Sequence, residues 1–307
     1  MADIVICEFM DEAVIGTVFA GRDVLYDPTL VDHADALDVA LTDARAVIVR
    51  NRTQVRAPLL DAAPHLKVVG RLGVGLDNID VAACKARGVA VHPASGANDL
   101  AVAEYVVGCA LLLLRGAYAA TDQVIAGGWP RMASIGRELA GTCMGLVGFG
   151  AIAQAVAVRV QALGMRVVAF DPYLPADHAA WKTVRSASLE QTLQQADVIS
   201  LHVPLTDATR HLIDAEALRS MHARAILINA ARGGVVDESA LADALREGRL
   251  AGAALDVFEQ EPLGADAASI FAGLDNLILT PHIGGVTEQS NVRVSAVTAQ
   301  NVLKYLD

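Results

Sequence analysis

Short apolar runs alternate with helix-like stretches along the chain, and this alternation predicts βαβ units built around parallel sheets. Five runs in the first hundred residues are strand candidates: Ile4 to Cys7, Val24 to Tyr26, Ala46 to Val49, Val68 to Val69 and Val89 to Val91. Six more follow later in the chain: Gly145 to Val147, Arg166 to Phe170, Val198 to His202, Ala225 to Asn229, Gly252 to Asp256 and Leu277 to Thr280. A helical stretch from about Leu100 to Ile125 separates the two series, so we expect two α/β units.

The chain closes on a helical pattern that has no strand left to cover in the second unit. This pattern runs from Gly285 through Leu306. We therefore expect the closing helix to return to the first unit, which makes that domain discontinuous. The predicted fold is α/β, with two doubly wound parallel-sheet domains, residues 1–97 plus 286–307 and residues 98–285. A cleft between two such units, facing the strand ends, is the usual place for a cofactor and a substrate to meet.

Composition agrees with this fold and restricts the partners. The chain has 307 residues, enough for two domains. Hydrophobic residues make up 54% and aromatic residues only 4%, so the cores must consist mainly of Ala, Val, Leu and Ile, as in buried parallel sheets. The formal net charge of -11 argues against a nucleic-acid partner, because nonspecific binding to phosphates requires an excess of Lys and Arg.

Cysteines and apolar segments indicate a cytoplasmic protein that does not enter a membrane. Cys7, Cys84, Cys109 and Cys143 lie far apart without metal-ligand spacing, so we expect reduced thiols and no metal site. The first residues show no export signal. The longest apolar run, Tyr105 to Leu114, is too short to span a bilayer, and we interpret it as part of a buried helix.

A glycine turn follows the first strand of the second unit and is typical of dinucleotide binding. The run from Gly145 to Ala153 contains Gly148, Gly150 and Ala153 in the pattern Gly-x-Gly-x-x-Ala. The first glycine permits the tight turn, the second lets backbone amides approach a pyrophosphate, and the alanine keeps the helix close to its strand. Such a turn is weak evidence alone, because any strand-to-helix turn favours glycine.

The next strand strengthens the cofactor interpretation. It ends at Asp171, at the distance downstream where an acid accepts hydrogen bonds from the adenosine ribose. Its charge would repel a 2'-phosphate, and no Arg follows within ten residues to attract one, so we predict NAD rather than NADP. The alternative is that Asp171 and Pro172 only end the strand in a turn.

Three later segments place a polar residue just after an apolar run. Arg232, Glu261 and His282 lie in the segments 229–234, 255–262 and 280–285. Reduction of a 2-oxo acid needs a cation for the carboxylate, which Arg supplies with two parallel hydrogen bonds. It also needs a proton donor that titrates near neutral pH, which is His, and an acid that orients and charges that ring, which is Glu.

Taken singly, each of the three has a structural explanation, as a strand cap, a turn acid or a surface ion pair. Their common position at strand ends, downstream of a dinucleotide turn, favours a catalytic group. His202, His211 and His222 have no such accompanying residues, and we interpret them as structural.

In combination, these motifs resemble those of the D-isomer-specific 2-hydroxyacid dehydrogenases, on the phosphoglycerate dehydrogenase side of that family. Gly70 to Asp80 and Asn98 to Glu104 match as well, so the resemblance covers nearly the whole chain. It implies a Rossmann-type NAD domain inserted into a discontinuous flavodoxin-like substrate domain, action on D-type acids, and a homo-oligomer, either a dimer or a tetramer. The chain departs from the family's commoner pattern at Ala153, and it stops without the regulatory C-terminal domains of many relatives, so we expect no serine feedback.

The resemblance also assigns individual roles. Arg232, Glu261 and His282 correspond to the family's catalytic residues, and Asp256 to the residue that binds the nicotinamide carboxamide. The implied cofactor contacts are Gly148, Gly150, Ala151, Ile152, Asp171, Ala230, Ala231, Arg232, Asp256, His282, Gly284 and Gly285.

Several arginines occur where the family builds its substrate pocket. The resemblance implies that Arg50, Arg71 and Arg131 lie near the group on carbon 3, and Arg52 is close in sequence. The other implied substrate contacts are Asn51, Val74, Gly75, Arg232 and His282. One carboxylate does not need so many cations, so we predict a second anion, the phosphate of 3-phosphoglycerate or the sulfonate of 3-sulfolactate. The alternative is that these arginines form surface or interface ion pairs.

Two other functions remain open at this point. A glyoxylate or hydroxypyruvate reductase would keep the same three catalytic residues with fewer cations at carbon 3. A nonenzymatic NAD-sensing scaffold would bind the nucleotide without turnover. A formate dehydrogenase is disfavoured, because that branch pairs its His with Gln, whereas this chain has Glu261.

Overall fold

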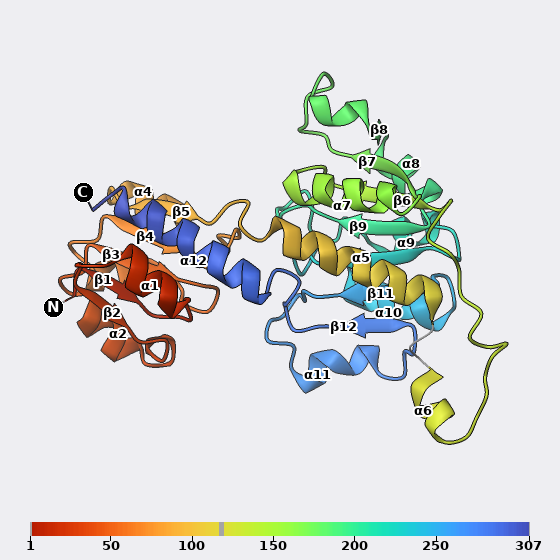
Figure 1. Cartoon of the computed structure of the whole chain (residues 1–307), viewed down its shortest axis with the longest axis horizontal. Coiled ribbons are helices and arrows are strands. Elements are labelled where there is room, and N and C mark those ends of the chain that lie inside the picture. The colour runs from red at the N-terminus through yellow and green to blue at the C-terminus, as the bar shows by residue number, and fades with distance from the viewer. Residues whose placement is uncertain (1, 117–119, 307) are drawn as a thin grey trace. The chain divides into compact units, whose positions relative to one another are not determined.

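The computed structural model describes residues 2–116 and 120–306, which form two compact units. One unit contains the residues up to Asn98 together with those from Val286 onward, and the other is Asp99–Gly285 (Figure 1). Both are parallel-sheet α/β units, so the predicted fold class is confirmed. The predicted boundary at residue 97 differs from the observed one by a single residue.

The first unit is built on a five-stranded parallel sheet in the order β2-β1-β3-β4-β5. Its strands are β1 (Ile4–Ile6), β2 (Val24–Tyr26), β3 (Ala46–Val49), β4 (Val68–Arg71) and β5 (Ala90–Pro93). This order is that of the flavodoxin-like fold. The central strands β1 and β3 are buried along their whole length, because helices cover both faces of the sheet, and this explains their uninterrupted apolar sequences.

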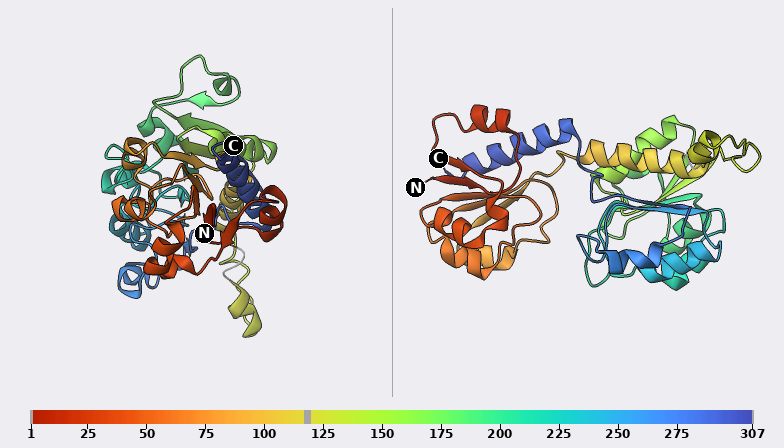
Figure 2. Two further views of the ribbon diagram at one scale, coloured as in Figure 1. Left: turned by 90° about the vertical axis from the view of Figure 1, so that its left-hand side faces the viewer. Right: turned by 90° about the horizontal axis from the view of Figure 1, so that it is seen from below.

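The helices of the first unit divide between the two faces of its sheet (Figure 2). They are α1 (Glu12–Val18), η1 (Leu30–Asp32), α2 (Ala34–Leu41), α3 (Ala57–Ala62), α4 (Val81–Ala86) and α12 (Glu288–Leu303). Helices α1 and α12 pack on one face, and α2, α3 and α4 on the other. The closing helix lies so close to β4 that a Cβ atom on Gly70 would come within 2.6 Å of the Val302 side chain.

The second unit is built on a seven-stranded parallel sheet in the order β12-β11-β10-β9-β6-β7-β8. Its strands are β6 (Cys143–Val147), β7 (Arg166–Phe170), β8 (Arg185–Ser186), β9 (Val198–Leu201), β10 (Ile226–Asn229), β11 (Gly252–Leu255) and β12 (Leu277–Leu279). This is the Rossmann order with one further strand. The order reverses between β6 and β9, so the glycine turn after β6 lies at the switch point where nucleotides bind in such sheets.

Helices also cover both faces of the second sheet (Figure 2). They are α5 (Asp99–Arg115), α6 (Thr121–Ile125), α7 (Ala151–Ala162), η3 (Ala179–Lys182), α8 (Leu189–Gln195), α9 (Ala215–Ser220), α10 (Glu238–Arg246), α11 (Ala265–Ala268) and η4 (Ser269–Phe271). Helices α5 and α7 share a core on one face, and α8, α9 and α10 share the core on the other. The parallel arrangement brings the loops after β6, β10, β11 and β12 to the same edge of the sheet.

The structure corrects three details of the sequence interpretation. The strand β8 was not predicted, because its two residues, Arg185 and Ser186, are both exposed and leave no apolar run. The helix predicted from Leu100 to Ile125 is not continuous, since α5 ends at Arg115, Gly116 has φ +57°, and α6 begins at Thr121. The part of that prediction over residues 117–119 lies outside the described residues. Within the predicted buried run, Leu111 and Leu112 are exposed.

No helix in the described part of the chain combines the length and the apolar character needed to cross a membrane.

Candidate active site

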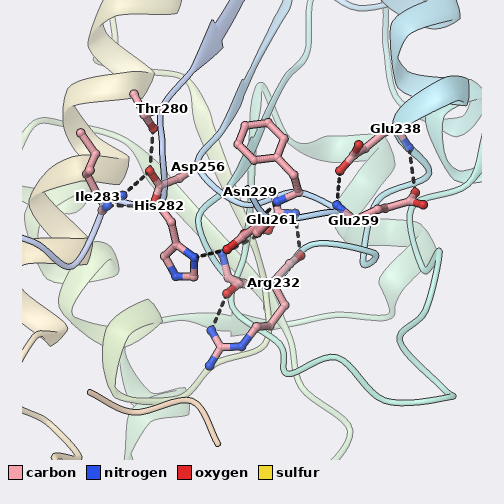
Figure 3. Close-up of polar contacts among 12 residues, drawn as sticks. Asn229, Arg232, Glu238, Asp256, Glu259, Glu261, Thr280, His282 and Ile283 are labelled. Carbon is pink, nitrogen blue, oxygen red and sulfur yellow. Dashed lines mark hydrogen bonds and ion pairs between the residues drawn. The ribbon is translucent and has the colours of Figure 1, made fainter. Parts of the chain in front are cut away.

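The three predicted catalytic residues all lie at the carboxyl edge of the seven-stranded sheet. Arg232 follows β10, Glu261 follows β11 and His282 follows β12, and these three strands are neighbours in the sheet. Figure 3 shows the three side chains gathered in one place. The structure therefore brings together the residues that the sequence analysis grouped by chemistry.

A short hydrogen bond joins the imidazole to the carboxylate. Nδ1 of His282 lies 2.7 Å from Oε2 of Glu261, and both side chains are partly exposed (Figure 3). The other carboxylate oxygen of Glu261 accepts the backbone amide of Phe258 at 3.1 Å. Since Nδ1 faces Glu261, Nε2 is the ring nitrogen that can exchange a proton with a bound molecule.

The surroundings of Glu261 keep it ionised. Burial raises the pKa of the Glu261 carboxyl, but the hydrogen bond and charge of His282, the Phe258 amide and the charge of Arg232 together lower this pKa below its ordinary value. A carboxylate in this position stabilises the protonated imidazole, because the two charges are opposite. The pair is therefore suited to holding and releasing a proton on the ring.

The loop after β10 is shaped so that Arg232 can approach this pair. The buried Asn229 donates to the carbonyl oxygen of Arg232 at 2.9 Å and accepts the amide of Ala231 at 3.1 Å, which fixes the turn. The Arg232 guanidinium donates to the carbonyl oxygen of Ala231 at 2.6 Å. A Cβ atom on Gly233 would lie 1.7 Å from the carbonyl oxygen of Phe258, so only glycine lets this loop pass the loop that carries Glu261.

Asp256 connects the loop after β11 to the loop that carries His282. Its side chain is 2% exposed, and Oδ1 accepts the Thr280 hydroxyl at 2.6 Å and the Ile283 amide at 2.8 Å. Oδ2 accepts the Gly284 amide at 2.7 Å, and a Cβ atom on Gly284 would come within 2.9 Å of that oxygen. The carboxylate therefore orders the backbone around His282. His282 itself has a φ of +56°.

The glycine turn has the shape that a pyrophosphate requires. Gly148 has φ +88°, and a Cβ atom there would lie 2.5 Å from the carbonyl oxygen of His202. Gly150 is the N-cap of α7 and provides no side-chain acceptor, so the first amides of the helix, including those of Ala151 and Ile152, point to the turn. Ala153 is fully buried against the sheet. The residues present fit a dinucleotide phosphate.

Comparison with known sequences identifies the family. The model of the family described as "D-isomer specific 2-hydroxyacid dehydrogenase, NAD binding domain" matches residues 107–284. The chain belongs to the D-isomer specific 2-hydroxyacid dehydrogenase family. The predictions of an NAD-dependent oxidoreductase of 2-hydroxy acids and of NAD as its cofactor are thereby confirmed.

Similar members of the family differ in how much of their own length this chain covers. A (S)-sulfolactate dehydrogenase from Chromohalobacter salexigens is 54% identical over 100% of this chain and 99% of its own length. A D-3-phosphoglycerate dehydrogenase from Methanocaldococcus jannaschii is 40% identical over 87% of this chain, which spans only 50% of that relative. The structure of a D-lactate dehydrogenase from Aquifex aeolicus, complexed with NAD and lactic acid, has a TM-score of 0.88 and 29% identity over 99% of this chain and 95% of that one.

The remaining residues predicted to contact the cofactor lie at the same edge of the NAD-binding unit of this dehydrogenase. Ala230 and Ala231 follow β10, and Gly285 follows Gly284 after β12. Asp171 follows β7, and its carboxylate accepts the amide of Phe149 in the glycine turn at 2.8 Å. It also accepts the amides of Tyr173 and Leu174. The bonds to Tyr173 and Leu174 agree with the alternative that Asp171 ends the strand in a turn, whereas its contact with the glycine turn was not predicted.

The predicted substrate residues of the other unit lie at the end of its own sheet. Arg50 follows β3, Arg71 ends β4, and Val74 and Gly75 come next. The Arg50 guanidinium donates to Oδ1 of Asn291 at 3.0 Å and lies 5.8 Å from the centre of the Phe9 ring. Burial lowers the pKa of Arg50.

The other predicted cations differ in their surroundings. Arg71 donates to the carbonyl oxygen of Leu72 at 2.6 Å. Arg52 forms an ion pair with Asp32 at an exposed position, which agrees with the alternative of a surface ion pair for that residue. Asn51 is exposed, and so is Arg131, which belongs to the NAD-binding unit.

The three histidines that were interpreted as structural, His202, His211 and His222, have protein partners. His202 is buried, its Nε2 lies 2.9 Å from the Ser200 hydroxyl, and burial lowers the pKa of His202 to about 4, so the ring is neutral. His211 lies 3.1 Å from Glu259 and His222 lies 3.8 Å from Asp197.

The close approach at Gly233 generates a test. We expect Gly233→Ala to lower the free energy of unfolding by about 1–3 kcal/mol, because the new methyl group must push the two loops apart. We expect it also to reduce kcat/KM, because Arg232 then moves away from Glu261. Gly16→Ala is the matched control, since Gly16 lies in α1 with nothing within 4 Å of a Cβ atom. Chemical denaturation and steady-state rates measure both effects, and wild-type values for Gly233→Ala would contradict the argument.

Proposed function

We propose that the chain oxidises 3-sulfolactate, a three-carbon 2-hydroxy acid with a second anion on carbon 3, in a reversible NAD-dependent reaction. The observation that carries the reaction type is the 2.7 Å contact between His282 and Glu261 beside Arg232. The substrate is suggested by the full-length relative from Chromohalobacter salexigens.

The stereochemistry of that relative's substrate agrees with a D-specific family. In lactate the carboxyl group outranks the methyl group, whereas in sulfolactate the sulfomethyl group outranks the carboxyl group. The R and S labels therefore exchange between the two acids. An S-configured sulfolactate has the same spatial arrangement as a D-lactate. We propose that this chain acts on that enantiomer.

The protein's own groups divide the work as follows. Arg232 binds the substrate carboxylate with paired hydrogen bonds, which fixes carbon 2 and its hydroxyl group. Nε2 of His282 takes the hydroxyl proton as the carbonyl forms, and Glu261 stabilises the imidazolium that results. Bound NAD would supply the acceptor for the hydride that leaves carbon 2. In the reverse direction, His282 returns the proton to the carbonyl oxygen.

We propose that Gly148, Gly150, Ala151 and Ile152 bind the pyrophosphate of NAD, and that Asp171 binds the adenosine ribose. Asp256 is the proposed partner of the carboxamide. The remaining proposed contacts are Ala230, Ala231, Gly284 and Gly285.

For the sulfonate we propose Arg50 as the principal partner. Its contacts with Asn291 and the Phe9 ring hold the guanidinium in one orientation, so less side-chain entropy is lost when an anion binds. Asn51, Arg71, Val74, Gly75 and Arg131 are proposed as further substrate contacts. A sulfonate carries one negative charge, whereas a phosphate monoester carries nearly two at neutral pH.

A steady-state panel with NAD tests this assignment. It compares 3-sulfolactate, 3-phosphoglycerate, glycerate and lactate, and the expected result is a kcat/KM for sulfolactate at least about tenfold above the others.

His282→Ala should lower kcat about 10²- to 10⁴-fold with NAD affinity retained, and Arg232→Ala should chiefly weaken substrate binding. Preference for phosphoglycerate would replace the proposed substrate, and wild-type turnover by His282→Ala would refute the mechanism. NAD binding with no turnover of any acid would favour a scaffold.

The preference for NAD over NADP has its own test. We expect Asp171→Ala to raise the NADP to NAD ratio of kcat/KM about tenfold or more, because the charge that repels a 2'-phosphate is removed. Activity with NAD should also fall, since Asp171 accepts the Phe149 amide of the glycine turn. Asp177→Ala, at an exposed position of the same loop, is the control. An unchanged ratio would count against the proposed role of Asp171.

We further propose that the chain is a cytoplasmic homodimer. Its four thiols are free and buried, in agreement with a reducing compartment. Large apolar side chains are exposed around α6, in which no residue is buried, and on the same unit at the end of α5. They are Leu111, Leu112, Val124, Ile125, Trp129, Met132 and Ile135. Two apolar surfaces on one unit allow a self-complementary contact between two copies.

Light scattering after gel filtration tests the dimer. The wild-type mass should be twice the 32.1 kDa of the chain, and the double variant Ile125→Asp with Trp129→Ser should run as a monomer, because both side chains are more than two thirds exposed. Val39→Asp, at an exposed apolar position in α2, should leave the mass unchanged. A monomeric wild type would refute the dimer, and a dimeric double variant would refute the surface.

A further inference from the structure

A carboxylate outside the catalytic trio holds the loop that carries Glu261. Glu238 is the first residue of α10, its side chain is 7% exposed, and Oε1 accepts the backbone amide of Glu259 at 2.6 Å (Figure 3). A buried carboxylate is costly unless it is hydrogen-bonded, so this contact fixes the relative position of the helix and the loop.

The contact is reciprocal. Oε1 of Glu259 lies 3.5 Å from the amide of Glu238 and 3.1 Å from Nε2 of His211. The amide of His211 in turn donates to the carbonyl oxygen of Gly234 at 2.7 Å. The cluster therefore joins the loop after β10, the start of α10 and the loop after β11.

Helix α10 is a firm support for this contact. Asp237 caps it by accepting the amide of Ala240 at 2.9 Å, and the helix buries Leu241, Ala242 and Leu245 in the core of the NAD-binding unit. A side chain on the first turn of such a helix has little freedom to follow a moving loop. The loop must therefore adapt to Glu238 rather than the reverse.

The loop between Asp256 and Glu261 is held at three points. Asp256 is bonded to the loop after β12, the Phe258 amide donates to Glu261, and the Glu259 amide donates to Glu238. The third anchor lies two residues before Glu261 and is the only one of the three whose partner belongs to a helix. The Asp256 amide also donates to Asn229 at the end of β10, and Phe258 packs in the core, but among the hydrogen bonds named here Glu238 holds the residue nearest to Glu261 from outside the loops.

The charges around Glu238 do not remove this contact. Burial raises the pKa of Glu238, the Glu259 amide opposes that rise, and the carboxylates of Glu259 and Glu261 add to it, while His211 opposes it. The carbonyl oxygen of a protonated carboxyl group also accepts a hydrogen bond, as does the oxygen of an amide. The anchor therefore needs an acceptor at Oε1, and a glutamine supplies one.

We propose that Glu238 is a positioning residue of the active site, which sets Glu261 against His282 by accepting the backbone amide of Glu259. This inference rests on the proposed function, because the pair it positions is the proposed acid–base pair. It adds a residue that touches neither cofactor nor substrate.

The experiment compares wild type, Glu238→Ala, Glu238→Gln and the control Asp243→Ala, which alters an exposed residue of the same helix. NMR titration of the His282 ring and the pH profile of kcat/KM for hydroxy acid oxidation are the two measurements. Loss of the anchor displaces Glu261 and makes the imidazolium less stable. In Glu238→Ala, the ring should therefore titrate about half a unit or more lower, and the acid limb of the profile should move with it.

The conservative variant separates positioning from charge and from stability. Glu238→Gln keeps the acceptor, so the titration and the profile should return to within about 0.2 units of wild type. A merely structural role would lower the yield of folded protein without moving either midpoint. Unchanged midpoints in Glu238→Ala, or equal shifts in Glu238→Ala and Glu238→Gln, would overturn the proposal. If Glu238→Ala does not fold, Glu238→Asp, whose carboxylate is one methylene shorter, serves in its place, and unshifted midpoints there would overturn it as well.

The two proposals can fail separately. If wild type oxidises no 2-hydroxy acid, the proposed function fails, while the NMR titration still reports whether Glu238 positions the pair. If wild type is active and His282→Ala is not, but the midpoints do not move in Glu238→Ala, only the positioning role fails.

Discussion

The candidate active site depends on one buried side chain, the carboxylate of Asp256. A carboxylate that is 2% exposed must be fully hydrogen-bonded, and here the bonds come from the Thr280 hydroxyl and the amides of Ile283 and Gly284. All of these donors belong to the loop that carries His282. The free-energy cost of burying this carboxylate is thus offset only when the loop adopts one conformation. Burial of Asp256 therefore fixes the position of His282.

A second layer of contacts extends this order outward. The hydroxyl of Tyr105, on α5, lies 2.6 Å from the Thr280 hydroxyl, and because Thr280 donates to Asp256, the tyrosine is the donor to Thr280. Burial raises the pKa of Tyr105. The phenol therefore stays protonated and can donate across the physiological range. The histidine loop is tied in this way to a long helix of the NAD-binding core.

Much of this architecture was predictable from the sequence, because fully covered parallel strands give uninterrupted apolar runs and parallel topology brings their ends together. Arg232, Glu261 and His282 could be grouped for that reason. The short strand β8 could not be predicted, since its residues are exposed. The break in the helix after Arg115 is marked only by Gly116, in a run whose apolar content favours a continuous helix.

The residues that support the proposed catalytic trio are harder to predict from the sequence than the trio itself. Gly233 and Glu238 act through backbone groups of residues distant in the chain, and such contacts leave no pattern in composition or spacing. Asn229 acts on the backbone of the turn that follows it. At Glu238 the sequence shows a glutamate followed by apolar residues at helical spacing, a pattern that predicts a helix start but not a buried carboxylate. Nothing in the sequence connects that position with a turn 21 residues later.

The grouping of Arg232, Glu261 and His282 on the same unit as the glycine turn has an evolutionary consequence. The hydrogen bonds described above that order Glu261, the loop of Arg232 and the loop of His282 are made within Asp99–Gly285. Substitutions around Arg50 and Arg71 in the other unit can therefore accumulate without removing any of these hydrogen bonds. Under the proposed function, in which Arg50 and Arg71 contact the substrate, a lineage can exchange one hydroxy acid for another while its acid–base pair is inherited unchanged.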